Sequence, residues 1–374
     1  MKQFCIIRSE DIQLASKKIL AAVDSSELSK VTESLQLKSE GSNLYLSVTN
    51  GDYFVKIRIE MDEPLDFHAT VNANLFLKLI SQITTDTIEL TVTDTALKLK
   101  GNGSYQLPLI FLGEELATLP EIEIKNPTAN FGIDAYILNS IANYNSKELD
   151  KGAPMRPAQN YYYIDEQGCI TYRTGACVNS FSLKQPVKLL LNNRLVKLFK
   201  LFKDEEVNFT LGYDALSDEI IQTKVRFETD DVSITAILSC DNTLLDSVPV
   251  SAIRDRAYSE YPYSINLNKD GLVQAINRLA LFAPTGNVDP DFVFEFDSDR
   301  VTIYDPNQEN SEEVYYTSTV LNLPEPYRTS FNLDDIKKTL DSCAESYITL
   351  NFGNEEAITI ARNKLINVIQ EIRD

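Results

Sequence analysis

Apolar and polar positions follow the same order in three stretches of the chain. Each begins with an apolar residue and an asparagine, continues with the spacing of an amphipathic helix, and ends in an alternating strand after a short polar turn. The three stretches are Val71–Val92, Leu191–Leu211 and Phe331–Phe352. Asparagine is a strong N-cap, because its side-chain oxygen accepts an orphan amide hydrogen of the first helical turn. The pattern therefore predicts three equivalent units of helix and strand, which begin at Asn72, Asn192 and Asn332.

A second unit, made of a strand, a polar step and an amphipathic helix, precedes each of these stretches. It occupies Phe4–Val23, Phe131–Tyr144 and Ile265–Phe282. A predicted hairpin follows each time, over Leu35–Val48, Tyr161–Tyr172 and Phe292–Ile303. Proline-bearing polar joints lie at Pro120–Pro127 and Ser247–Pro262. Because such internal repetition indicates tandem domains, we predict an α+β fold of three copies of one domain, each with two helices packed on antiparallel sheets. The predicted copies are residues 1–125, 126–257 and 258–374.

Charge is distributed unevenly between the predicted helices and the remaining chain. The helix predicted over Asn192–Lys203 has an apolar stripe, Leu195, Leu198, Phe199 and Phe202, and the cations Arg194, Lys197, Lys200 and Lys203 on its other half. Taken alone, such a helix is better explained as a solvated surface helix whose cations keep the protein soluble than as a ligand site. The six predicted helices together hold 11 Lys and Arg against 7 Asp and Glu, however, in a chain of net charge −20. Cationic helices in an acidic protein indicate a local surface for an anionic partner.

The composition leaves little material for catalysis. His68 is the only histidine and lies in a strand-like alternation, so we interpret it as structural. Gly101 and Gly103 have hairpin spacing, and no phosphate-binding glycine loop is present. The five cysteines are scattered without a Cys-x-x-Cys pair, which is typical of reduced thiols. No apolar run is long enough for a membrane span, and the N-terminus lacks the apolar stretch of a signal peptide. We therefore expect a cytoplasmic protein that is not an enzyme.

The repeat and its local sequences resemble the bacterial-type DNA sliding clamps, the beta subunit of DNA polymerase III. The resemblance covers the whole chain and includes VNANLFLKLISQI followed by DTIELTVTDTALKLKGNGSYQLPL. It implies a non-catalytic processivity factor, in which two three-domain subunits close head to tail into a ring lined by helices. The implied partners are double-stranded DNA bound without sequence preference, a second copy of the chain, and polymerase and clamp loader bound through short linear peptides. It implies no cofactor and no metal, and a place in the cytoplasm at the nucleoid.

The resemblance assigns three sets of residues. The DNA-facing set is Lys17, Lys18, Lys78, Arg156, Arg194, Lys197, Lys200, Lys203, Arg278, Lys337 and Lys338. The partner-peptide groove is Thr174, Gly175, Ala176, Cys177, Val178, Pro249, Val368, Ile369, Ile372 and Arg373. The dimer interface is Tyr105 and Leu107 against Leu281 and Phe282. For the last two residues the alternative is the internal core of their own domain.

Two departures from the family concern the groove. The hairpin exit reads RTGACV where the family usually has Asp, His and Arg around the glycine, and the tail reads VIQEIRD where an apolar run is usual. They indicate a divergent clamp, of phage, plasmid or similarly distant type. An alternative function is a scaffold or regulator with the clamp fold that binds replication proteins without encircling DNA, which the net charge of −20 would suit. A metal-dependent hydrolase is disfavoured, because clustered acidic motifs are missing and histidine is scarce.

Overall fold

The structure of the protein is a computed structural model that describes residues 3–374 except 24–29, 64–65, 144–156, 173–174, 204, 216–220, 239–241, 284–290, 318, 342, 344, 355–356, 363–364 and 371–374. The chain forms two compact units: unit 1 contains Met1–Ala142 and Arg194–Cys240, and unit 2 contains Asn143–Asn193 and Asp241–Asp374. These units do not follow the three predicted domains, because the predicted middle domain gives strands to a sheet in each unit. The division at 125 and 257 stays a prediction.

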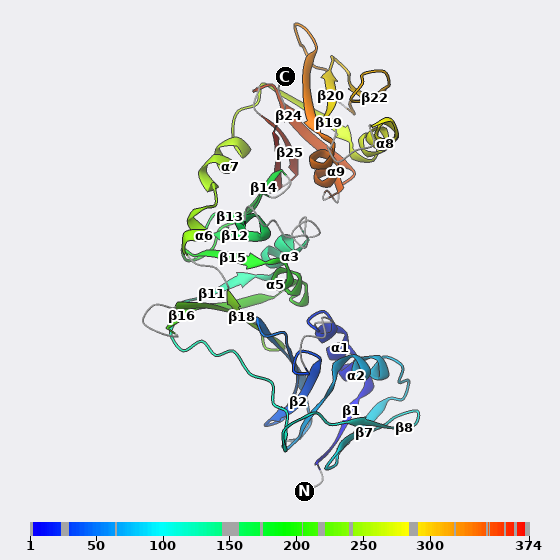
Figure 1. Ribbon diagram of the computed structural model, residues 1–374, viewed down its shortest axis with the longest axis vertical. Helices are drawn as coiled ribbons and strands as arrows, with labels where there is room; N and C mark the ends of the chain where they lie inside the picture. The colour runs from blue at the N-terminus through cyan, green and yellow to red at the C-terminus, as the bar shows by residue number, and fades with distance from the viewer. Residues whose placement is uncertain are drawn as a thin grey trace. The chain divides into compact units, whose positions relative to one another are not determined.

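Short helices and many antiparallel strands make up both units (Figure 1). The helices are α1 (Ser9–Leu20), α2 (Ala73–Ile80), α3 (Ala135–Ala142), α5 (Asn193–Leu198), α6 (Asn242–Asp246), α7 (Val250–Ala257), α8 (Lys269–Leu279) and α9 (Leu333–Asp341), with 3₁₀ turns η1 (Pro157–Asn160), η2 (Phe199–Leu201) and η3 (Ala280–Phe282). The strands of unit 1 are β1 (Gln3–Arg8), β2 (Ser34–Glu40), β3 (Asn43–Thr49), β4 (Tyr53–Glu60), β5 (His68–Asn72), β6 (Thr87–Val92), β7 (Ala96–Lys100), β8 (Ser104–Pro108), β9 (Phe111–Leu112), β10 (Glu115–Leu116), β11 (Pro127–Asp134), β16 (Glu206–Ala215), β17 (Ile221–Glu228) and β18 (Val232–Leu238). Those of unit 2 are β12 (Tyr161–Asp165), β13 (Gly168–Thr171), β14 (Ala176–Ser180), β15 (Lys188–Asn192), β19 (Tyr263–Asn268), β20 (Asp291–Phe296), β21 (Arg300–Tyr304), β22 (Ser311–Tyr315), β23 (Tyr327–Asn332), β24 (Tyr347–Phe352), β25 (Ala357–Arg362) and β26 (Leu365–Gln370).

Unit 1 is built on an eight-stranded sheet and a four-stranded sheet. The first has the order β11-β16-β17-β18-β4-β3-β2-β5, and the second the order β1-β6-β7-β8. Helices α1 and α2 pack side by side, and α1 lies on β3 and β4 (Figure 1). Because side chains alternate across a strand, Leu44 and Leu46 of β3 are fully buried while Tyr45 between them is not. This alternation of buried and less buried residues agrees with the strand predicted from the sequence.

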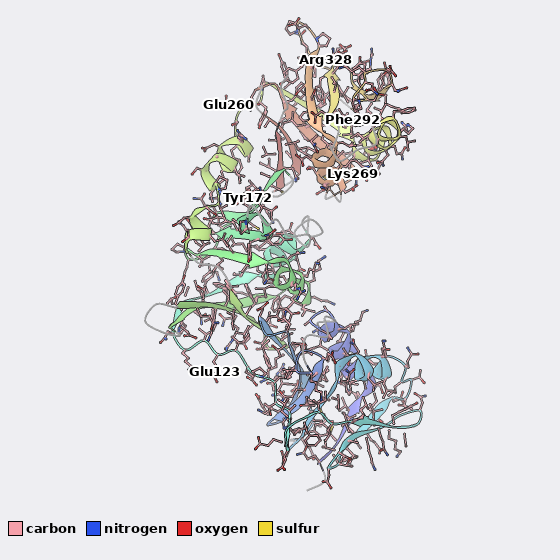
Figure 2. All side chains as sticks on the ribbon, in the orientation of Figure 1. Glu123, Tyr172, Glu260, Lys269, Phe292 and Arg328 are labelled. Carbon is pink, nitrogen blue, oxygen red and sulfur yellow. The ribbon has the colours of Figure 1, made fainter. Side chains whose placement is uncertain are left out.

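Unit 2 repeats the same arrangement. Its eight-stranded sheet has the order β15-β12-β13-β14-β26-β25-β24-β19, and its four-stranded sheet the order β22-β21-β20-β23. Helices α8 and α9 contact each other above a core rich in phenylalanine. The stacked rings of Phe296 and Phe352, whose centroids are 4.2 Å apart, join the two sheets in that core. Phe292 lies within it (Figure 2).

The helix starts confirm two of the predicted N-caps. The side chain of Asn72 accepts a hydrogen bond from the amide of Leu75 at 2.9 Å, and Asn332 accepts one from the amide of Asp335 at 3.3 Å. Asn268, which opens the second kind of repeated unit, caps α8 in the same way through the amide of Gly271 at 2.8 Å. The α+β fold with two helices per repeat, predicted from periodicity, is confirmed.

Helix α7 is an element that the sequence pattern did not predict. Proline and polar residues indicated a joint over Ser247–Pro262, but Val250–Ala257 within it is helical. Ile253 and Ala257 lie four residues apart, on one helical face, and both are buried. The helix packs against β14 and β26. A face of two buried residues within an eight-residue helix is too weak a pattern to distinguish a short helix from a turn.

Strand pairing joins successive repeats into continuous sheets. In unit 1, β18 pairs antiparallel with β4, and in unit 2, β14 pairs antiparallel with β26. Each eight-stranded sheet thus consists of two repeated four-stranded sheets, and the junction pairs the last strand of one with the last strand of the other. The equivalent last strands of the remaining two sheets are β8 and β22. Among the described strands, each of these forms the end of its sheet.

Candidate functional site

The cations of α5 and η2 lie on the surface above a fully apolar base. Arg194, Lys197, Lys200 and Lys203 are all exposed. The predicted stripe residues Leu195, Leu198, Phe199 and Phe202 are buried, as are Val196 and Leu201. The α-helix ends at Leu198 and continues as the 3₁₀ turn Phe199–Leu201, so the predicted single helix changes type at its middle. The buried side of this segment is domain core, as predicted.

The other predicted DNA-facing cations have more varied surroundings. Lys17 on α1 and Lys78 on α2 are exposed, whereas Lys18, Lys337 and Lys338 are half-buried. The guanidinium of Arg278 makes a two-point contact with Glu312 on β22, with N–O distances of 2.6 and 2.7 Å. That hydrogen-bonded pair raises the pKa of Arg278 and lowers the pKa of Glu312. Arg278 is therefore already engaged by an acid, and Arg156 lies outside the described residues.

A cavity of about 460 Å³ in unit 2 brings together part of the predicted groove. It is lined by Gln159, Tyr172, Gly175, Ala176, Pro249, Ala252, Ile253, Arg256, Asp335 and Val368. Four of these are predicted residues: Gly175, Ala176, Pro249 and Val368. Cys177, Val178 and Ile369 are buried in the strands behind it. Thr174, Ile372 and Arg373 lie outside the described residues.

The remaining lining residues come from three parts of the chain that sequence reasoning did not connect. Tyr172 follows β13 (Figure 2), Arg256 lies on α7, and Asp335 lies in the first turn of α9. No local pattern signals that these segments meet, since their proximity depends on the β14–β26 pairing and on α7. The lining is mixed, because it contains small apolar residues together with an arginine and an aspartate.

One ion pair fixes the helical wall of this groove. The guanidinium of Arg254 on α7 donates to both carboxylate oxygens of Asp165 at 2.6 and 2.8 Å. The side chains are only 15% and 7% exposed, so the pair is largely shielded from water. The hydrogen bond to Asp165 raises the pKa of Arg254. Burial, together with the negative charge of Asp165, raises the pKa of Tyr163 to about 12. A two-point contact of this kind fixes the orientation of a helix as well as its position.

Gly175 is required by the groove's backbone. Its φ is +64°, a left-handed conformation that side chains with a Cβ adopt at a cost. A Cβ placed there would lie 3.1 Å from the carbonyl oxygen of Val368 on β26. The glycine thus allows the chain to enter β14 close beside the strand with which it pairs.

The predicted interface residues differ in accessibility. Leu281 is 81% and Phe282 53% exposed at the end of α8 and η3, so they are not internal core. Helix α8 also contacts the end strand β22. On β8, Tyr105 is 37% exposed, but Leu107 is 1% exposed. Leu107 is therefore a core residue of its own sheet, and Tyr105 is the exposed aromatic residue on this strand.

The described residues offer little other chemistry. No group of three or more potential metal-ligating side chains occurs among them. Cys5, Cys169, Cys177 and Cys343 are buried and are not in disulfides, which agrees with the predicted reduced cysteines. The His68 ring is hydrogen-bonded to Gln36 at 2.8 Å, and burial lowers its pKa, which agrees with the predicted structural role. No helix in the described parts of the chain has the length and apolar character needed to cross a membrane.

Comparison with known proteins gives a clear result at the level of fold. No family model matches the chain, and no curated protein matches it by sequence. The structure is similar over its whole length to solved DNA sliding clamps. The DNA polymerase III subunit beta of Borrelia burgdorferi, in complex with a natural product, has a TM-score of 0.77 at 14% identity, covering 100% of this chain and 98% of that one.

Two further solved clamps show a similar likeness to this chain. The sliding clamp of Pseudomonas aeruginosa bound to griselimycin has a TM-score of 0.76 at 15% identity, and the beta clamp of Helicobacter pylori bound to a DNA ligase peptide has 0.70 at 16% identity. In both cases all of each chain is covered. The protein therefore has the fold of a DNA sliding clamp. More narrowly, that fold is the one adopted by the beta subunit of bacterial DNA polymerase III.

Proposed function

We propose that the protein is a non-catalytic processivity factor, and that two copies close head to tail into a ring around double-stranded DNA. The ring holds a DNA polymerase, its loader and other partners on the duplex by binding short peptides in the groove of unit 2. It needs no cofactor and acts in the cytoplasm, where the nucleoid is replicated. Likeness to clamps at 13–16% identity supports the fold, and the features of this chain support the function.

The observation that supports the ring most directly is the pair of unmatched strands β8 and β22. Two of three equivalent junctions between repeated sheets are made inside the chain, by β18 with β4 and by β14 with β26. The third junction would join β22 to β8. A strand at the end of a sheet presents unpaired amide and carbonyl groups that favour pairing with another strand. If β22 of one copy pairs with β8 of the next, two copies form a closed assembly of six repeats.

The two internal junctions have the same register, which fixes the expected third one. Lys56 faces Ser233 in the first, and Val178 faces Ile366 in the second. In each repeated sheet, one row of paired residues starts three positions before the first residue of the helix, and both pairs continue this row. The corresponding rows end at Ser104 on β8 and at Ser311 on β22. Ser311 of one copy is therefore expected to lie opposite Ser104 of the next.

Cysteine pairing tests this register. A chain with Ser104→Cys and Ser311→Cys is expected to form covalent dimers under mild oxidation, because directly opposite Cβ atoms in antiparallel strands are about 5 Å apart. The matched control, Ser104→Cys with Tyr315→Cys, moves the second thiol about 13 Å along β22. Equal crosslinking in both chains, or none in either, would contradict the proposed edge pairing.

The groove supports partner binding, because it is concave and of the size that binds small ligands or short peptide segments. Filling it with Ala252→Trp is expected to abolish binding of a polymerase or loader peptide. Ser251→Trp places the same side chain on the neighbouring exposed position of α7, outside the lining. It should leave peptide binding unchanged. Loss of binding with both variants would point to disruption of α7 instead of occupation of the groove.

Topological linkage tests encirclement itself. A loaded ring is expected to stay on nicked circular DNA and to slide off after the circle is cut, because no base is gripped. If the protein binds replication partners but never becomes linked to the circle, this result would support the alternative function, a clamp-fold scaffold. The net charge of −20 is the feature that favours that alternative, since an acidic protein surface repels DNA.

A further inference from the structure

Strand β1 forms the edge of its four-stranded sheet opposite to β8, and among the described strands it pairs with β6 alone. The amide of Ser9, directly after β1, donates to the carbonyl of Asp86 at 2.9 Å. Because bonded and non-bonded pairs alternate along an antiparallel ladder, the amide and carbonyl groups of Phe4, Ile6 and Arg8 point away from β6. No backbone hydrogen bond within the described parts of the chain reaches these three residues from the open side. They therefore form an unpaired edge of the kind that favours another strand.

Phe4 and Ile6 also expose apolar side chains on the outer face of this sheet. Their exposed fractions are 48% and 52%, whereas Cys5 and Ile7 are buried on the opposite face. The two residues lie five and three positions before the first residue of α1. At the same positions before the other five helices of the repeat, the single apolar side chain is Leu190, which is 1% exposed. An exposed apolar pair at this place is thus particular to β1.

The space beside this edge is open at one end and closed at the other. A cavity of about 180 Å³ begins at Arg8 and has the apolar residues Leu14, Ile57 and Ile59 in its lining. Its charged lining residues are three cations and three acids, so the cavity itself selects no charge. At the start of β1, the side chain of Gln3 accepts a hydrogen bond from the first amide of β5 at 2.7 Å. The accessible length of the edge is therefore residues 4–8.

The outer face beside the apolar pair is basic, in contrast to the chain as a whole. The charged residues that strand pairing places on this face are Arg8, Glu89, Lys98 and Lys100. They are three cations and one acid, in a chain of net charge −20. Lys100 contacts Glu89 at 3.0 Å and Arg8 contacts Asp11 at 2.7 Å, but the two cationic side chains are 65% and 77% exposed. Such exposed pairs are weak and can be exchanged for an acidic ligand.

We propose that β1 is a second docking site, at which an extended segment of a partner protein adds as a strand beside residues 4–8. The segment has apolar side chains next to Phe4 and Ile6 and an acidic side chain next to Arg8. Main-chain hydrogen bonds supply the affinity of strand addition and alternate side chains its specificity, while the basic face attracts an acidic segment. The proposed ring uses β8 at the other edge of the sheet, so its closure leaves β1 accessible.

Peptide binding to the full chain tests the proposal. The probe is the fluorescein-labelled peptide EETVTVT, in which a glutamate and two valines share one face of a strand, and the charge control is KKTVTVT. Anisotropy is expected to show saturable binding of the acidic peptide and weaker binding of the basic one. Phe4→Ser/Ile6→Ser should weaken binding about tenfold, because it removes the apolar contacts on both valines. No saturable binding of EETVTVT, or equal binding of KKTVTVT, would overturn the proposal.

A matched variant separates loss of the site from loss of the fold. Leu20→Ser/Leu75→Ser removes two apolar side chains that are 53% and 51% exposed on α1 and α2. It should leave the affinity for EETVTVT unchanged, and both double variants should keep the melting temperature of the unmodified chain. Equal weakening by the two double variants would contradict the assignment to β1.

Residue-resolved hydrogen exchange tests the addition of a strand. The amides of Phe4, Ile6 and Arg8 are expected to exchange fast in the free protein and about tenfold slower when the peptide occupies about 90% of the sites. The amides of Cys5 and Ile7 bond to β6 and should be protected in both states. Peptide binding without protection of the first three amides would indicate a ligand lying across the face, such as a helix, and would overturn strand addition. Protection that appears at high protein concentration without peptide would assign the edge to a second copy of the chain and would also overturn the proposal.

The inference fails or stands independently of the proposed function. Ala252→Trp fills the groove of unit 2 and should leave the affinity for EETVTVT unchanged. If this variant loses the peptide, the peptide binds in the groove and the inference is wrong. If the unmodified protein binds EETVTVT at β1 but never becomes linked to nicked circular DNA, the docking site stands and encirclement is wrong.

Discussion

The exposed pair Leu281 and Phe282 allows a quantitative test of ring closure. At 81% and 53% exposure, these apolar side chains lie beyond the end of α8, the helix that contacts the unmatched strand β22. A monomer has no need of two large apolar groups at such a position. If β22 pairs with β8 of a second copy, the pair is expected to be covered, with Tyr105 as its nearest accessible apolar neighbour on the other side. Replacing both residues by serine should then weaken the dimer without weakening the fold.

The magnitude follows from the exposed fractions. Full burial of a leucine or phenylalanine side chain stabilises by about 1.5–3 kcal/mol. Scaled by exposure, covering Leu281 contributes about 1.6 kcal/mol and covering Phe282 about 1.2 kcal/mol, or nearly 3 kcal/mol for each contact. A closed two-copy ring has two such contacts, so L281S/F282S removes about 6 kcal/mol of dimer stability. At 1.4 kcal/mol per tenfold change, the dissociation constant rises about 10⁴-fold.

Analytical ultracentrifugation over a dilution series measures this change directly. The unmodified chain is expected near twice its 42.2 kDa, and the variant near 42.2 kDa at micromolar concentration. The control Y213S/Y347S removes two aromatic side chains, 42% and 62% exposed, from other strands and should leave the dimer intact. Unaltered dimerisation of L281S/F282S, or equal weakening by the control, would refute the reasoning. Unchanged melting of the monomeric variant at high dilution would confirm that only association was lost.

Three further predictions concern the elements that hold the sites in place. Arg254→Met leaves the 7% exposed Asp165 carboxylate without its partner, so we expect a loss of about 3–5 kcal/mol of stability and weaker peptide binding. Urea titration and peptide affinity measure these effects, and Arg254→Met/Asp165→Asn should recover part of both. Gly175→Val forces a φ of +64° on a β-branched residue beside Val368, which should cost about 1–3 kcal/mol and reduce groove affinity more than Gly113→Val, whose Cβ meets open space at a similar φ. The pKa of Asp214 is lowered, first by the hydrogen bond from Lys224 at 2.8 Å and then by the amides of Lys125 and Asn126. The ionised carboxylate therefore stabilises the fold at any pH above its pKa in the unfolded chain, about 3.9. This stabilisation is lost as the pH falls through the lower pKa of the folded state. Thermal melting between pH 5 and pH 2.5 should therefore fall less steeply in Asp214→Asn than in the unmodified chain, and equal slopes would contradict this assignment.

Local pattern in the sequence determined most of the secondary structure. The hairpin between Glu40 and Asn43 and that between Asp165 and Gly168 turn where polar residues interrupt the alternation. The asparagine at the start of a helix and the apolar stripe at Leu195, Leu198, Phe199 and Phe202 are likewise local signals. Such features depend on residues within one or two turns of each other, so a single sequence contains them. The threefold repetition of these signals then indicated the clamp fold.

Only the tertiary structure decided which of these elements meet and which side chains remain accessible. The cavity of unit 2 exists because β14 pairs with β26 and α7 packs across them, so Tyr172, Arg256 and Asp335 come together from distant parts of the chain. Leu107 and Leu281 are equally apolar in sequence, yet one is buried and the other exposed. Arg278 is paired with an acid on β22, and the cations Arg194, Lys197, Lys200 and Lys203 are exposed because the apolar residues between them are buried. Periodicity specifies the faces of each element, but the pairing of sheet edges over long sequence separations determines what those faces meet.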